Sequence, residues 1–155
     1  MRALLSTALM FLIFVSSVAA VLLPAHAADQ VHSPAKTQDT RLAVDFPEGI
    51  KQAMLERMRR HLSSIHEIQK ALAESDYDRV ADVAENSLGL SSLGPHNARQ
   101  APHMPEVMQH LGMEMHRASS RLARVAQETD MVKTLEGLSQ VTGLCVGCHA
   151  VYRAK

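Results

Sequence analysis

Apolar residues recur at helical spacing through most of this chain, and no other feature restricts its fold as strongly. The clearest run has intervals of three and four between its apolar residues: Met108, Leu111, Met115, Ala118, Leu122 and Val125. Residues at these intervals share one face of an α-helix and form a seam for packing on neighbouring helices. No long stretch alternates with period two, so the sequence predicts no sheet.

Four amphipathic helices are predicted after residue 45, at approximately 46–74, 75–89, 108–125 and 131–153. Asp45 is the expected N-cap of the first helix, and Ser75 with Asp78 resembles a capping box at the second. Leu62 in the first helix, and Val132 and Leu135 in the last, are expected on inner faces. Residues 89–104 form one long connection. The predicted fold is all-α, an antiparallel four-helix bundle with one long crossover loop.

The first 27 residues have the features of a secretory signal. Met1-Arg2 is positively charged, residues 3–23 are apolar, and Ala25-His26-Ala27 matches a small-x-small cleavage site. A retained membrane anchor is the alternative, because the apolar run is long enough to span a bilayer. The predicted organisation is a cleaved signal at 1–27, a flexible leader at 28–45 and a helical domain at 46–155. We therefore expect this protein to be exported to the periplasm.

Composition narrows the function classes. Sixteen basic and sixteen acidic residues give a net charge of +0, so nucleic-acid binding is not expected. Aromatic residues make up only 3%, while there are nine Met and the predicted inner faces are rich in Ala. Since Met is flexible and Ala is small, such a core could be completed by a group that is not protein.

The motif Cys145-Val146-Gly147-Cys148-His149 is the attachment signal of c-type haem. On a helix Cys145 and Cys148 share a face, so their sulfurs can form thioethers with two vinyl groups of one porphyrin. His149 can then bind the iron as proximal ligand. A disulfide would close only a tiny loop and would leave His149 unexplained. A thioredoxin-like redox pair belongs at the start of a helix in a βαβ unit. One covalent haem c is therefore the expected cofactor.

This motif at the end of a four-helix chain resembles the class II c-type cytochromes, the cytochrome c-prime group and its methionine-ligated relatives. The resemblance covers about residues 46–155. It implies a haem within the bundle, with a residue of the first helix facing the iron opposite His149. Pairing Pro47-Glu48 with the Pro-Glu that often opens this helix in the family places Met58 there. Met54 is the second candidate and His61 the third. The alternative for both Met residues is ordinary core packing.

Several other polar groups have ordinary structural interpretations. His103, Met104, Met108, His110, Met113, Met115 and His116 could supply soft ligands for copper, but core and surface positions explain them better. Arg57, Arg59 and Arg60 are expected on a solvated face, where one could pair with a haem propionate. Arg153 is expected to close the last helix or to lie near the proximal ligand.

Two functions follow from the iron coordination. With Met58 bound, the iron has no open position and the protein would carry single electrons to periplasmic or membrane redox partners. With an apolar distal residue, as in cytochrome c-prime proteins, a five-coordinate iron would bind or sequester nitric oxide or carbon monoxide. No acid–base pair is assigned to a distal pocket, so an enzyme such as a weak peroxidase is least favoured. The resemblance also implies a homodimer through the first two helices.

Overall fold

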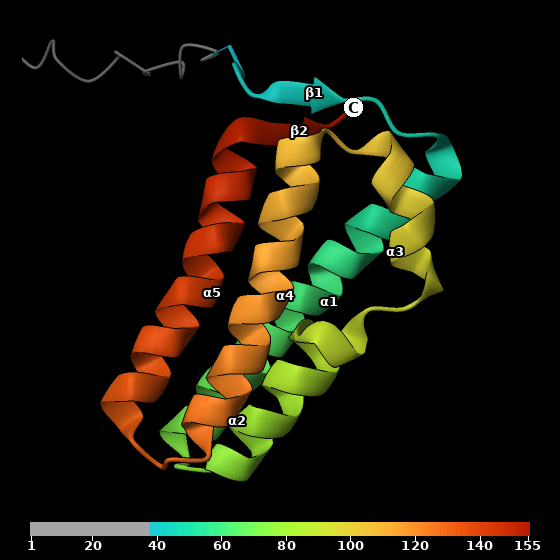
Figure 1. Ribbon diagram of the computed structural model, residues 1–155. Coiled ribbons are helices and arrows are strands. Elements are labelled where there is room, and N and C mark those ends of the chain that lie inside the picture. Colours follow the sequence, from blue (N-terminus) through green and yellow to red (C-terminus); the bar gives the residue numbers. More distant parts are fainter. Residues whose placement is uncertain (1–37) are drawn as a thin grey trace, which may run out of the picture. The chain divides into compact units, whose positions relative to one another are not determined.

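The computed structural model describes residues 38–155, and the compact unit within them spans Asp39–Lys155. This unit is a bundle-like, all-α arrangement (Figure 1). Its long helices are α1 (Glu48–Ala73), α4 (Glu106–Ala126) and α5 (Met131–Val151), and the shorter α2 (Tyr77–Val83) continues into a π-helical turn, η1 (Ala84–Leu88). The predicted signal at 1–27, and most of the predicted leader, lie outside the described residues.

The first residues of the helices α5, α2 and α1 differ in how they are capped. Asp130 caps α5 by accepting a hydrogen bond from the Lys133 N–H at 3.1 Å. At α2 the capping side chain is Asp76, not Ser75, and it accepts from the Arg79 N–H at 3.0 Å. The prediction of Asp45 as the N-cap of α1 was wrong, because Pro47 occupies that position without a side-chain cap.

The long connection between η1 and α4 contains short helices. It consists of η2 (Leu90–Ser92), α3 (Pro95–Gln100) and η3 (Ala101–His103). Gly89, at its start, lies against α4, where an added Cβ would be 2.7 Å from the Ser120 Oγ. The Leu90 N–H donates to that same oxygen at 2.9 Å. This close approach requires glycine at residue 89 and fixes the connection to α4.

A short parallel pair of strands corrects the prediction of no sheet. β1 (Leu42–Val44) pairs with β2 (Tyr152–Ala154), with Leu42 opposite Tyr152. Consequently α5 ends at Val151 instead of Arg153, and the folded unit begins at Asp39 instead of residue 46. Strands of three residues are too short to show a period of two, so this pairing had no sequence signal.

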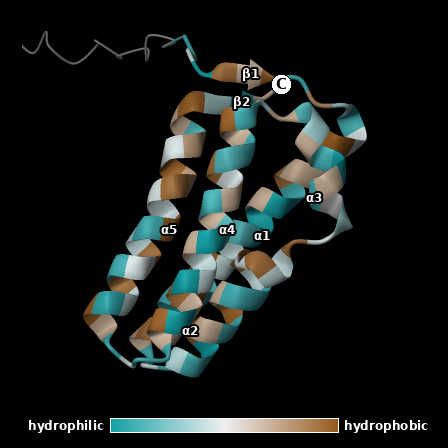
Figure 2. Ribbon diagram, viewed as in Figure 1, coloured by the Kyte–Doolittle hydropathy of each residue, from teal (hydrophilic) through white to brown (hydrophobic). Residues whose placement is uncertain are grey.

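The buried residues form two separate apolar clusters. The larger joins α1, α2, η1, α4 and α5 and includes Ile68, Leu88, Leu122 and Val141. The smaller joins the strand end to the start of α1: Val44, Phe46, Met54 and Tyr152. Figure 2 shows apolar and polar residues alternating along each helix, as expected of amphipathic helices.

Three predicted inner positions are instead exposed. Leu62 is 71% exposed, Val132 66% and Leu135 48%. On α5 the buried residues are Thr134, Leu138 and Val141. Residues placed at a constant interval of three move steadily around a helix, because the helix has 3.6 residues per turn. Val132 and Leu135 therefore lie off the face that Leu138 and Val141 share. Within residues 38–155, no helix combines the length and apolarity needed to cross a membrane.

Candidate functional site

An apolar cleft lies between α1, α4 and α5. α4 packs along α5, and α1 packs along α2, but within the described residues α1 and α5 have no comparable backbone packing. The space between them contains two cavities of about 310 and 520 Å³, which share several wall residues. The shared residues are Leu55, Met58, His61, Gly112, Met115, Cys148 and His149. Together these cavities, called the apolar cleft below, have the size of a cofactor pocket.

The α4 wall of the cleft combines large side chains with one glycine. Met108, Gly112, Met115 and His116 line it, and a Cβ added to Gly112 would meet no atom within 4 Å. The missing side chain at Gly112 therefore leaves space in the middle of this wall. The flexible Met side chains beside this space can adapt to the shape of a bound group.

The Cys pair lies in the last two turns of α5, and both thiols border the cleft. Cys145 and Cys148 are half-buried and free, so the structure has no disulfide between them. Burial raises the pKa of both thiols, and Cys145 raises that of Cys148 further. The negative end of the helix dipole also disfavours a thiolate there. A redox-active pair requires a lowered thiol pKa, so the surroundings disfavour a thioredoxin-like role.

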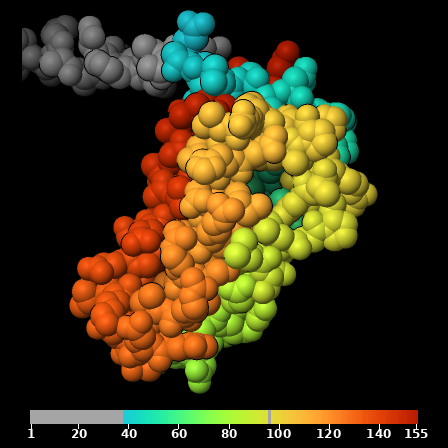
Figure 3. Space-filling model, in the orientation of Figure 1, coloured from blue at the N-terminus to red at the C-terminus, as the bar shows by residue number. Residues whose placement is uncertain are grey.

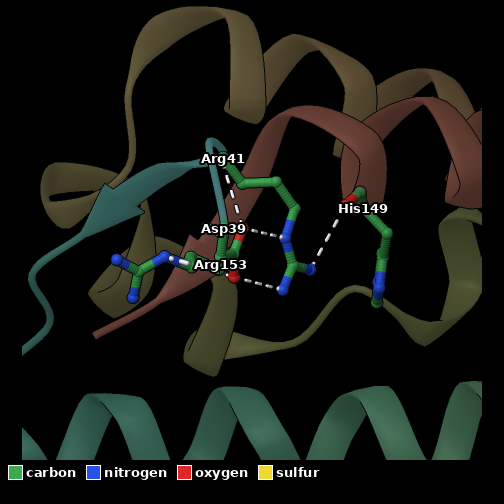
Figure 4. A network of polar contacts seen from close by, with 4 residues as sticks. All are labelled: Asp39, Arg41, His149 and Arg153. Carbon is green, nitrogen blue, oxygen red and sulfur yellow. Dashed lines mark hydrogen bonds and ion pairs between the residues drawn. The ribbon is translucent and has the colours of Figure 1, made fainter. Parts of the chain in front are cut away.

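His149 is exposed and lies on the walls of both cavities of the cleft. Its backbone is held by residues far away in the chain (Figure 4). Arg41, just before β1, donates from Nη1 to the His149 carbonyl at 3.4 Å and from Nη2 to Asp39 Oδ2 at 2.8 Å. Arg153 Nε lies 3.5 Å from the same carboxylate oxygen. Figure 4 shows the imidazole pointing away from this network, so the backbone is anchored while the ring stays available.

Arg153 is connected to His149 only indirectly, through Asp39 and Arg41, and its expected place beside the proximal ligand stays a prediction. The Asp39 carboxylate, between two guanidinium groups, has a pKa lowered to about 2, chiefly by its hydrogen bonds from Arg41. The expectation that Arg153 closes the last helix was wrong, because it belongs to β2.

The two candidate Met ligands of α1 differ in their surroundings. Met58 is half-buried and lines both cavities, on a different helix from the Cys pair and His149. Met54 is 6% exposed, belongs to the smaller apolar cluster, and borders only one cavity. Both Met side chains contribute to packing, but Met58 has the larger contact with the cleft.

His61, the third candidate, is paired with a residue whose burial the sequence did not predict. Its ring lies edge-to-face with that of His116, 5.8 Å between centroids. His116 is not part of the predicted seam of α4 but is only 6% exposed, and its Nδ1 lies 2.6 Å from the Leu88 carbonyl oxygen. The buried small residues beside it, Ser119 and Ser120, widen the buried face of α4 beyond the predicted seam. These small residues were the one feature of the sequence that could have predicted the wider buried face of α4.

The arginine cluster is only partly on a solvated face. Arg59 and Arg60 are exposed, and Arg60 donates to Glu56 at 2.6 Å. Arg57 is half-buried and borders the cleft. Burial, with a smaller effect of Arg60, lowers the pKa of its guanidinium. No carboxylate in the described part of the chain pairs with Arg57, which leaves a half-buried positive charge beside the cleft.

Comparisons with protein-family models, curated proteins and solved structures found no match for this chain. Within residues 38–155, no three His, Cys, Asp or Glu side chains are grouped so that they could hold a metal ion by themselves. The chemical arrangement that the structure does bring together is two thiols, an imidazole and a thioether around one apolar cleft.

Proposed function

We propose that this chain is an exported c-type cytochrome that carries single electrons through one covalently attached haem. The observation that carries the proposal is that Cys148, His149 and Met58 line the same apolar cleft from two different helices, with Cys145 beside them. In this proposal α1, α2 with η1, α4 and α5 are the four helices of an antiparallel bundle, and residues 89–104 are its crossover.

The residues present fit such a cofactor. The cleft is lined mainly by apolar side chains, and Gly112 leaves room at its α4 wall. Cys145 and Cys148 are free thiols at its α5 wall. Each thiol would add its S–H across a vinyl group, which needs no net oxidant or reductant. Arg57 offers a positive charge for an acidic substituent of the ring.

The chain's own residues would hold the iron from two sides. The imidazole of His149 and the thioether of Met58 are both suitable iron ligands, and a His/Met pair favours a raised reduction potential. Arg41 donates to the His149 carbonyl at 3.4 Å, which adds a restraint on the backbone of this ligand. When bound, the haem iron would supply a one-electron couple, and the apolar walls would limit its contact with water.

Electron transfer is favoured over gas binding by the position of Met58. Met58 borders both cavities from α1, and Cys148 and His149 border them from α5, so a thioether and an imidazole line the same space from different helices. An iron bound by His149 and Met58 would have no free position for nitric oxide or carbon monoxide. A five-coordinate, gas-binding protein of the cytochrome c-prime type is the competing function, and it requires Met58 to remain a packing residue.

The deciding experiment is an absorption spectrum of the purified, oxidised protein. A low-spin spectrum with a weak far-red band from sulfur–iron ligation supports the proposal. Met58→Ala should convert it to a high-spin spectrum, whereas Met113→Ala should not. Met113 is an exposed methionine of α4 that does not line the cleft, so it controls for the loss of a thioether elsewhere.

A high-spin wild-type spectrum that shifts with carbon monoxide after reduction would overturn the electron-carrier proposal in favour of gas binding. A spectrum unchanged by Met58→Ala would instead transfer the ligand role to Met54 or His61, each testable by the same substitution. Covalent attachment is tested separately by haem staining of the denatured chain, which should weaken in Cys145→Ala and Cys148→Ala. An unstained wild-type chain would overturn the whole proposal.

Export and partners belong to the same proposal. Haem attachment to a Cys-x-x-Cys-His motif takes place outside the cytoplasm, in agreement with the signal predicted at residues 1–27. The proposed location is the periplasm, with redox proteins of the periplasm or membrane as partners. A homodimer through α1 and α2 is proposed on the family resemblance, and analytical ultracentrifugation of the haem-loaded protein would test it.

A further inference from the structure

The last turn of α5 carries His149 and has carbonyl groups that the helix itself does not satisfy. The last four carbonyls of an α-helix have no intrahelical N–H partner, so they need donors from elsewhere. The Tyr152 N–H donates to the Cys148 carbonyl, and Arg41 Nη1 donates to the His149 carbonyl at 3.4 Å. The donor to His149 therefore comes from a residue 108 positions away in the chain.

The Arg41 guanidinium is held in place by Asp39. The Asp39 carboxylate accepts from the Arg41 backbone N–H at 3.1 Å, from Nε at 2.9 Å and from Nη2 at 2.8 Å. Two parallel bonds between a guanidinium and a carboxylate fix the plane of the guanidinium. The remaining nitrogen, Nη1, is the one that reaches the His149 carbonyl. The two side chains thus form one unit that directs a single donor at the end of α5.

The strand pair brings this unit to the end of the helix. Leu42, directly after Arg41, pairs with Tyr152, and Figure 3 shows the first described residues, in cyan, against the C-terminal residues, in red. Val44 and Tyr152 belong to the smaller apolar cluster, on which Cys148 packs. Because two strands of three residues are only marginally stable by themselves, the side-chain contacts beside them add to the restraint on this end of α5.

Arg41 lies where it can affect the direction of the imidazole. Arg41 and His149 both line the cavity of about 310 Å³ in the apolar cleft. A side chain occupies staggered rotamers defined by its own backbone, so a contact that holds the carbonyl of His149 limits the directions open to its ring. Since Asp39 already balances the charge of Arg41, an acidic group of a cofactor is not needed to explain this arginine.

We propose that Asp39 and Arg41 are positioning residues for the proximal iron ligand. Asp39 orients the Arg41 guanidinium, Arg41 holds the His149 carbonyl, and the imidazole is thereby directed at the iron. Contacts behind a metal ligand orient that ligand and affect metal binding. The inference rests on the proposed function, which assigns His149 to the iron, and it gives a role to residues of the segment 28–45 that the sequence predicted as a flexible leader.

Amide hydrogen exchange of the purified full-length chain, read by mass spectrometry, tests the contact itself. Arg41→Gln should speed the exchange of residues 149–154 about fivefold, because a hydrogen bond from a charged group is lost and the last turn opens more often. Residues 131–145 should exchange as in the wild type. The matched control is Arg79→Gln, because Arg79 is also exposed and pairs with an aspartate, Asp82 at 2.9 Å, but lies on α2.

Unchanged exchange of residues 149–154 in Arg41→Gln, or equal acceleration in Arg79→Gln, would overturn the proposal whether or not the chain carries haem. Circular dichroism shows that each variant is folded.

Proton NMR of the oxidised, haem-loaded protein tests the effect on the ligand. The spread of the haem methyl resonances depends on the orientation of the axial imidazole, a property that a general loss of stability would not change. Arg41→Gln and Asp39→Asn should both shift this pattern, and Arg79→Gln should not. A methyl pattern unchanged in Arg41→Gln would overturn the positioning role.

Arg41→Lys separates the position of the donor from its charge. Lysine keeps the positive charge but lacks the planar fork that Asp39 holds, so it should not restore the wild-type methyl pattern. Full restoration by Arg41→Lys would overturn the proposal, since charge alone would then be sufficient. None of these variants removes a thiol, so haem staining of the denatured chain should stay intact in each, and failure of the positioning role is distinguishable from failure of the proposed function.

Discussion

Lowering the pH from 7.5 to 5 should destabilise the folded chain, with His61 responsible for a large share of the loss. Burial is the main cause that lowers the pKa of His61 from 6.5 to about 4, and His116, Arg57 and Arg60 add to it. Because the folded pKa is depressed, the unfolded chain takes up a proton near pH 6.5 that the folded chain accepts only near pH 4. The stability from neutral His61 is therefore fully present above pH 6.5 and is lost between pH 6.5 and 4.

The size of the loss follows from the same pKa values. One pH unit corresponds to about 1.4 kcal/mol for a single group, so the fall from pH 6.5 to 5 should reduce the free energy of unfolding by about 2 kcal/mol. His116 has a pKa lowered by burial and contributes in the same direction. The carboxyl groups whose pKa values are lowered, such as Asp39, titrate below this interval. A haem in the cleft would bury His61 further and would leave the sign unchanged.

Urea unfolding followed by circular dichroism at pH 7.5, 6.5 and 5 measures the effect. His61→Gln should flatten the pH dependence by about 2 kcal/mol over this interval. The matched control is His110→Gln, which removes an exposed histidine of α4 and should lose stability in parallel with the wild type. Parallel curves for wild type and His61→Gln would refute the reasoning, since they would show that His61 is not held neutral by the fold.

Three further substitutions test the packing and the cleft. Leu122→Ala removes a fully buried side chain that packs on Gly137, so unfolding in urea should show a loss of about 2–5 kcal/mol. Asp130→Ala removes the N-cap of α5 and should cost about 1 kcal/mol by the same measurement; an unchanged stability would contradict the assigned cap. Gly112→Leu should fill the apolar cleft and lower the haem bound per chain, measured by absorbance, while circular dichroism shows intact helices. Full haem content in this variant would place the cofactor elsewhere.

The helices could be predicted because their signal is repeated over many turns. The seam from Met108 to Val125 falls within α4, and α5 begins at Met131, where the last helix was predicted to start. The strand pair could not be predicted, since each strand has only three residues and its stability comes from a partner more than a hundred residues away. Tyr152 was expected to continue the last helix to Arg153, whereas Tyr152 pairs with Leu42 and α5 ends at Val151.

Some residues of the candidate site could be predicted from the sequence and others could not. Cys145, Cys148 and His149 are recognisable because their spacing along a single helix carries the signal. Met58 was placed by resemblance, and the structure adds that it borders the cleft from α1. Arg57 was expected on a solvated face, and His116 lies outside the predicted seam, because a polar residue on a helix is normally solvated. Their burial depends on how the connection before α4 folds over α1, which no local pattern describes.

The two halves of α4 explain why the apolar cleft lies beside the N-terminal half of this helix. Its C-terminal half buries small residues, Ala118, Ser119, Ala123 and Ala126, so neighbouring helices approach closely and the larger apolar cluster forms there. Its N-terminal half presents long Met side chains on either side of Gly112, which neither fill the space nor draw α1 towards α5. With aromatic residues at only 3% of the chain, few large flat side chains are available to close that gap. The Cys pair is placed at the same end, where an attached planar group would complete the packing that the side chains leave unfinished.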